Sequence, residues 1–112
     1  MAKVVISESL EREISKKFKK ESVKVFELLY SLENNPKKGK VVGNVGKIVV
    51  KELKHGSFRF YFITDGFKLK VLEVNDLKDL LIKVVRMSDK KNQQKVIDEV
   101  KDVLREFGGD GF

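Results

Sequence analysis

The segment 57–64, SFRFYFIT, constrains the fold most, because its residues alternate strictly between two kinds. Successive side chains of a β-strand point to opposite faces of its sheet. One face would carry Phe58, Phe60 and Phe62, and the other Ser57, Arg59, Tyr61 and Ile63. The aromatic face suits packing against helices, and a guanidinium beside a phenol suits contact with a phosphate ester. The pattern is equally compatible with Arg59 solvating an exposed sheet face.

The length of 112 residues predicts a single domain, which we place at residues 1–108 and follow with a flexible tail at 109–112. The chain has no cysteine and one histidine, so we expect no disulfide, no metal site and no cofactor. It also lacks an apolar run of about twenty residues and a signal-peptide-like start, which predicts a cytoplasmic protein without a membrane partner. Lysine supplies 20 of the 24 basic residues, a usage typical of heat-adapted, including archaeal, proteins.

The net charge of +7 is concentrated in one stretch of the chain. Residues 37–59 carry a net charge of +6, whereas 1–36 carry +1 and 60–112 are balanced. A dense basic surface attracts a polyanion, either a nucleic acid or an acidic protein segment, although a charge run is also compatible with a solvated face. The expected nucleic-acid-binding residues are Lys37, Lys38, Lys40, Lys47, Lys51, Lys90 and Lys91.

The first half of the chain predicts a strand and a helical segment. We expect a strand at 3–6, helical structure from 7 to 33 and a basic loop at 37–44. Two apolar stripes are compatible with one long helix or with two helices broken near 19–21. Ser7 or Ser9 can cap the start, and Pro36 stops helical geometry at the end.

The second half predicts an antiparallel meander followed by a helix. We expect strands at 46–54, 57–64 and 68–74, joined by turns at 55–57 and 65–66. Residues 75–87 fit either a helix or a strand, and their β-branched content favours a turn at 75–79 and then a strand. Ser88 or Asp89 would cap a final helix that ends at 108–109. The expected fold class is α+β, with an N-terminal strand and helical hairpin packed on an antiparallel sheet and a C-terminal helix.

Three motifs in this order resemble the RelE/ParE toxin superfamily, and its HigB-like, phage-derived branch most closely. They are NNPKKGK at 34–40, KELKHGSFRFYF at 51–62 and VVRMSDKK at 84–91. The resemblance covers nearly the whole chain and implies a RelE-like fold. It implies the toxin of a toxin-antitoxin system, a metal-independent, ribosome-dependent mRNA endonuclease (mRNA interferase) that inhibits translation through attack of a 2′-hydroxyl on the adjacent phosphate. The implied partners are an acidic antitoxin protein, the ribosome and mRNA.

The resemblance also implies roles for single residues. Arg59 would hold the scissile phosphate, with Lys51, Lys54 and Arg86 adding positive charge around the anionic transition state. His55 or Tyr61 would relay a proton. An imidazole suits that role near neutral pH, whereas a phenol needs a strongly lowered pKa, so His55 is preferred if it faces the groove. As a hairpin-turn residue, His55 is also compatible with simple solvation.

A second class of function stays open, in which the protein is a noncatalytic RelE-fold module that binds RNA or protein. No tyrosine follows Arg86, where active relatives carry one. Glu52 stands where many relatives have a basic residue, and a carboxylate would repel a phosphate. A DNA-binding function ranks last because no segment resembles a recognition helix.

Overall fold

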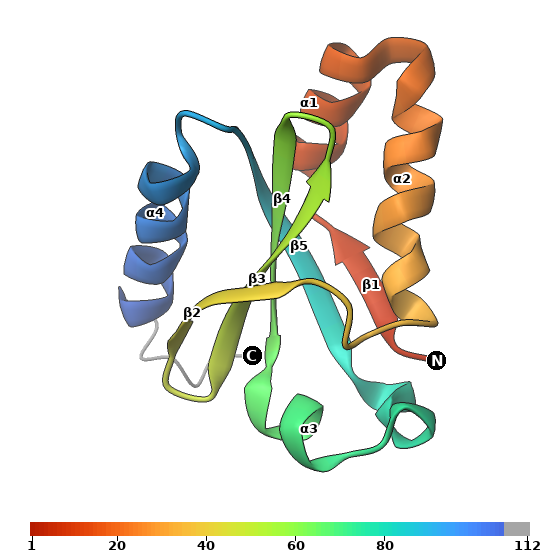
Figure 1. The fold of residues 1–112 in the computed structure, drawn as a ribbon, viewed down its shortest axis with the longest axis vertical. Coiled ribbons are helices and arrows are strands. Elements are labelled where there is room, and N and C mark those ends of the chain that lie inside the picture. Colours follow the sequence, from red (N-terminus) through yellow and green to blue (C-terminus); the bar gives the residue numbers. More distant parts are fainter. Residues whose placement is uncertain (107–112) are drawn as a thin grey trace.

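The computed structural model describes residues 1–106, which form a five-stranded sheet with helices on both faces (Figure 1). The strands are β1 (Lys3–Ile6), β2 (Lys40–Val45), β3 (Ile48–His55), β4 (Phe58–Asp65) and β5 (Leu81–Asp89). The helices are α1 (Glu8–Phe18), α2 (Ser22–Tyr30), α3 (Gly66–Val71) and α4 (Gln93–Glu106). Short 3₁₀ turns occupy Lys19–Glu21, Ser31–Glu33 and Val74–Asp79. The expected α+β class is confirmed.

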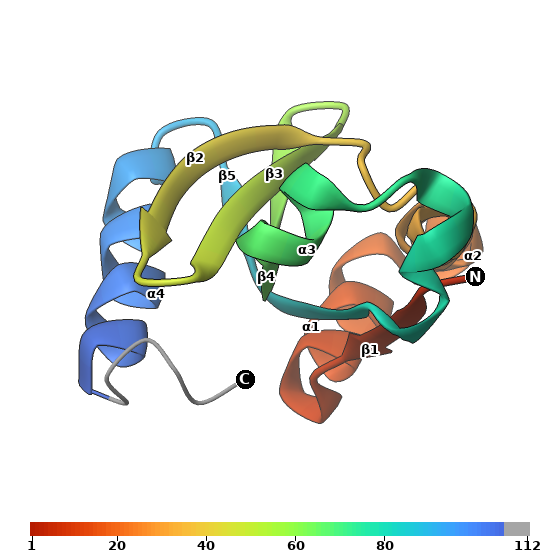
Figure 2. The ribbon, with the colours of Figure 1, turned by 90° about the horizontal axis from the view of Figure 1, so that it is seen from below.

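The strand order across the sheet is β1-β5-β4-β3-β2. Strand β1 runs parallel to β5, and the other neighbours are antiparallel, so the sheet is mixed rather than purely antiparallel as expected. Helices α1 and α2 cover one face and α4 covers the other, as the view from below also shows (Figure 2). The molecule therefore has three layers, with the sheet in the middle.

The N-terminal helical segment is two helices, so the alternative of one long helix is wrong. The Ser7 side chain accepts a hydrogen bond from the Leu10 N–H and caps α1, as predicted. Lys19 then adopts a positive φ of 51°, and its N–H donates to the Ser15 carbonyl, which ends α1 and turns the chain. A 3₁₀ turn leads into α2, which lies beside α1 on the same sheet face.

The alternating strand is β4, and its two faces are as the sequence predicts. Phe60 and Phe62 are fully buried in the cluster that α1 and α2 form with the sheet. Phe58 is half-buried and packs its ring edge-to-face on Phe18, with centroids 5.2 Å apart. Ile63, from the alternate set, packs instead in a second cluster with α4. The side chains of β4 thus contribute to both cores.

The strand expected at 68–74 is wrong, because α3 and a 3₁₀ turn occupy that stretch. The Asp65 side chain accepts a hydrogen bond from the Lys68 N–H and caps α3. Asp65-Gly66 is therefore not the hairpin turn predicted from the sequence. The loop expected at 37–44 is also wrong in part, because β2 pairs with β3 from residue 40 onward. The strand alternative for 75–87 is confirmed by β5.

At the C-terminal end, the Asp89 alternative fits better than Ser88. Ser88 lies within β5, whereas the Asp89 carboxylate accepts a hydrogen bond from the Asn92 N–H just before α4. The expected helix end at 108–109, the domain boundary at 108 and the tail at 109–112 lie outside the described residues. Within residues 1–106, no helix is long and apolar enough to cross a membrane.

We predict that Phe60→Ala lowers the free energy of unfolding by about 3–5 kcal/mol, because it removes a fully buried ring and leaves a cavity. Phe67→Ala is the matched control, since Phe67 is 64% exposed on α3 and its loss should change stability by less than about 0.5 kcal/mol. Urea denaturation of both variants measures the difference. Equal costs would contradict the assignment of Phe60 to the main core.

Candidate functional site

Four of the five expected catalytic residues project from the sheet face that α4 covers, which we call the α4 face. Lys54 of β3 pairs with Arg59 of β4, and Tyr61 pairs with Arg86 of β5. Residues that pair across neighbouring strands share a face of the sheet. The remaining residue, His55, pairs with Phe58 and belongs to the opposite face.

Arg59 is engaged within the protein. Its side chain is buried, and its Nε lies 3.1 Å from Oε1 of the equally buried Glu52. Its Nη1 donates hydrogen bonds to the backbone carbonyls of Phe58 and Gly56, at 3.1 and 3.3 Å. The Nε contact is an ion pair rather than a hydrogen bond, since this buried nitrogen has no acceptor in line with its N–H. The guanidinium is therefore neutralised by an internal carboxylate.

Tyr61 extends the same buried network. It is fully buried, and its hydroxyl shares a hydrogen bond of 2.9 Å with the Ser88 hydroxyl. Burial raises the pKa of the Tyr61 phenol above its ordinary value of 10.0, and the Glu52 carboxylate adds to this rise. The Ser88 hydrogen bond and Arg59 oppose the rise but do not cancel it. Tyr61 therefore stays neutral at physiological pH and is not a general base there.

Exposed cations surround this buried network. Lys40 pairs with Glu52 across β2 and β3, so it shares the α4 face with Lys54 and Arg86. All three are exposed, and we call them the basic strip. The β5–α4 loop adds Lys90 and Lys91, which are also exposed. Five cations thus reach solvent on or beside the α4 face.

His55 does not face this site. It lies on the α1/α2 face, where its ring meets Phe18 edge-to-face with centroids 5.8 Å apart. A catalytic role for His55 required its ring to face the same side of the sheet as Arg59, and it faces the opposite side. The alternation of β3 places it there, because Lys54 occupies the other side of the strand.

Lys51 is likewise on the α1/α2 face, where it is buried and not exposed as a surface contact to a nucleic acid would require. Its buried ammonium donates to the backbone carbonyl of Lys37 at 2.9 Å and lies 5.8 Å from the Phe62 ring. Burial lowers the pKa of Lys51 below its ordinary value of 10.5. Gly39 lets this loop approach, because a Cβ there would lie 2.9 Å from Phe62 Cζ.

The other predicted nucleic-acid-binding lysines are exposed, but of these only Lys40 belongs to the basic strip. Lys37 and Lys38 line a separate hollow of about 410 Å³ together with Asn35 and Val74. Lys47 lies in the turn between β2 and β3. The charge that is concentrated in the sequence is therefore divided among different parts of the surface.

Sequence reasoning missed Ser88 as the partner of Tyr61 and missed Glu52 as the partner of Arg59. The Glu52 pairing follows from the β3–β4 hairpin register, so counting back from the turn would have placed the two side chains on one face. Ser88 had no such signal, because the β4–β5 register shifts at Tyr61 and Phe62, where β5 carries an extra residue.

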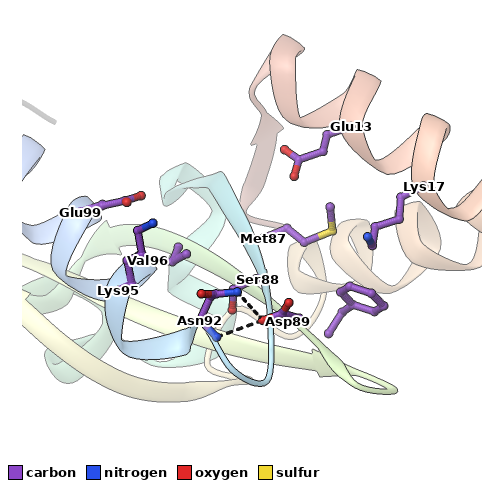
Figure 3. Close-up of a pocket in the computed structure, with 10 residues that line it drawn as sticks. Glu13, Lys17, Met87, Ser88, Asp89, Asn92, Lys95, Val96 and Glu99 are labelled. Carbon is purple, nitrogen blue, oxygen red and sulfur yellow. Dashed lines mark hydrogen bonds between the residues drawn. The ribbon is translucent and has the colours of Figure 1, made fainter.

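Sequence reasoning also missed a trough between α1 and α4, with a volume of about 360 Å³ (Figure 3). Across the described part of the chain, no group of three or more histidine, cysteine or acidic side chains is arranged to hold a metal ion.

Comparison of the chain with protein-family models, with curated proteins and with solved structures found no match.

We predict that Arg59→Met costs about 3–5 kcal/mol of unfolding free energy, because it leaves the Glu52 carboxylate buried without its partner. The double variant Glu52→Leu/Arg59→Met should recover most of that loss. Arg105→Met, which breaks an exposed pair with Asp102, is the control and should cost less than about 1 kcal/mol. If Arg59→Met behaves like this control in urea denaturation, the buried ion pair is wrong.

We predict that the Tyr61 phenolate forms only above pH 10, because burial disfavours the charged form. The ultraviolet titration of wild type minus that of Tyr61→Phe isolates this group. Unfolded Tyr61 loses its proton at a lower pH than folded Tyr61, so the wild type should lose stability relative to Tyr61→Phe as pH rises above 10. A difference titration centred below pH 10 would contradict the raised pKa.

Proposed function

We propose that this protein is a RelE-like, noncatalytic module that binds RNA through the basic strip. The observation that carries the proposal is the buried Glu52–Arg59 ion pair, in which Arg59 is only 8% exposed. The order of elements, a strand, a helical hairpin, antiparallel strands and a closing helix, agrees with what the family resemblance implies. The fold of residues 1–106 and the positions of their charges thus support an RNA-associated protein without a working nuclease centre.

Among the described residues, the arrangement lacks both a free cation and a proton-transfer group placed as a nuclease would need them. A cation that stabilises a phosphorane must reach the phosphate, and Arg59 is paired with Glu52 instead. A general base must lose its proton near neutral pH, and burial moves Tyr61 away from that condition. His55 packs on Phe18, on the opposite sheet face from Arg59. These features favour binding over cleavage.

Binding needs only accessible positive charge, which the basic strip supplies. Lys40, Lys54 and Arg86 come from three different strands, so the sheet fixes their spacing. Lys90 and Lys91 extend the charge beyond the end of β5. Each phosphate that such a cation neutralises releases condensed counterions, which gives favourable but salt-sensitive binding.

The proposal predicts that Lys40→Gln/Lys54→Gln/Arg86→Gln reduces the salt dependence of binding to a single-stranded RNA. Losing three phosphate contacts should flatten the slope of log affinity against log salt by about 2, at roughly 0.7 for each contact on a single strand. The control Lys16→Gln/Lys20→Gln/Lys78→Gln removes three exposed charges from other surfaces and should keep the slope. Filter binding at several salt concentrations measures both. Equal slopes for the two triple variants would contradict the assignment.

A second candidate, the mRNA interferase toxin held by an acidic antitoxin, is favoured by one observation. The strand register brings Lys54, Arg59, Tyr61 and Arg86 onto one sheet face, as a phosphate-holding centre would need. Cleavage would further require Arg59 to leave Glu52 for the substrate.

Expression of the protein alone, with mapping of cut sites on ribosome-bound mRNA, separates the two functions. The noncatalytic proposal predicts no cuts and no growth inhibition. Cuts that Lys54→Gln/Arg86→Gln abolishes, in a variant that stays folded, would overturn it in favour of the toxin. These exposed positions are better tests than Arg59, whose loss is predicted to destabilise the fold.

A further inference from the structure

Strand β5 has one open edge over its second half. Strand β1 pairs only with Leu81–Val84, and the backbone then leaves the sheet, with the Ser7 N–H donating to the Val84 carbonyl. Within residues 1–106, β4 is the only strand that pairs with β5 beyond that point. An open edge presents a row of backbone donors and acceptors that can pair with another strand.

The trough lies along this open edge. Its floor includes Met87, Ser88 and Asp89 of β5, and its walls are α1 on one side and α4 on the other (Figure 3). Met87 and Ser88 are buried and Asp89 is exposed, so this edge passes from the interior to the surface along the trough. The space is open to solvent and is bounded by two helices and a strand edge, which suits one extended chain.

The walls of the trough are charged, with opposite signs at its two ends. Lys17 of α1 lies 4.9 Å from the Phe58 ring, and Phe58 pairs with Asp89, so Lys17 marks the end of the trough where β5 finishes. Lys95 is in the first turn of α4, which begins just after β5, and marks the same end. Glu13 and Glu99 lie one helical turn away on the same helix faces, toward the other end (Figure 3).

We propose that this trough binds an extended peptide segment of a partner protein, which adds to the sheet as a strand next to β5. Its backbone pairs with the open edge, and its side chains alternate between the α1 wall and the α4 wall. A basic residue of the segment lies between Glu13 and Glu99. An acidic residue lies between Lys17 and Lys95. This surface is separate from the basic strip, so the proposal does not depend on RNA binding.

A single strand is a better occupant of this place than a second copy of this chain. A copy that paired through its own open β5 edge would bring its α1 and α4 into a space of about 360 Å³. A single strand needs no such room. The charge pattern also calls for opposite charges at the two ends of one short segment, which a peptide can supply alone.

The test uses the heptapeptide Lys-Thr-Val-Thr-Val-Thr-Glu-amide, with fluorescein joined to its N-terminus through a Gly-Gly linker so that the lysine keeps its charge, and the peptide of reversed sequence with the same linker and label. Only one of the two peptides can place its lysine between Glu13 and Glu99 and its glutamate between Lys17 and Lys95, for a given strand direction next to β5. We expect that peptide to bind, as measured by fluorescence anisotropy. Replacing its central threonine by proline removes a backbone donor and should abolish binding. On binding, hydrogen exchange should slow in residues 85–89. The overturning result is that neither peptide binds, that the proline peptide binds equally, or that protection falls elsewhere.

Variants of the walls test the charge pattern. Lys17→Glu/Lys95→Glu turns attraction at one end into repulsion and should weaken peptide binding roughly tenfold, as expected for two rim charges. The control Lys16→Glu/Lys20→Glu changes the net charge equally on exposed helical positions outside the trough and should leave binding unchanged. Equal losses in both variants would overturn the proposal. A concentration-dependent dimer that protects residues 85–89 would also overturn it, in favour of a second copy.

Discussion

The ion pair between Glu52 and Arg59 decides what the α4 face of the sheet can do. Two buried charges are costly to remove from water and are tolerated because each neutralises the other. Tyr61 and Ser88 complete this polar interior with their own hydrogen bond. Arg59 and Tyr61, the most reactive side chains of β4, are consequently bound to other groups of the protein. The charges available to a ligand are the exposed ones around them.

The three layers of the fold account for this arrangement. One aromatic set of side chains fills the space under α1 and α2, and the alternate set is covered by α4. Arg59 and Tyr61 lie on the face that α4 covers and are themselves buried, so the site that the sequence offered to a substrate is closed to solvent. Lys40, Lys54 and Arg86 escape this cover and remain available to a polyanion.

Local patterns in the sequence predicted much of the fold. The alternation in β4, the Ser7 cap and the final amphipathic helix are signals within a few residues, and the structure follows each of them. The prediction of a hairpin turn at Asp65-Gly66 was wrong because the same two residue types can form a turn or begin a helix. The burial of Arg59 depends on tertiary packing and on its pairing with Glu52 across the hairpin, and the local pattern of β4 does not specify either. The trough was hidden for a similar reason, since it is formed by three elements far apart in the chain.

The central claim is that Arg59 stays paired with Glu52 while RNA binds elsewhere on the α4 face. Nuclear magnetic resonance of the arginine side-chain Nε–H groups during an RNA titration tests this most directly. We predict that the Arg59 Nε–H signal exchanges slowly with solvent and does not shift, while the Arg86 signal moves as RNA is added. A shift of the Arg59 signal with RNA, together with faster exchange once Glu52 is released, would contradict the account.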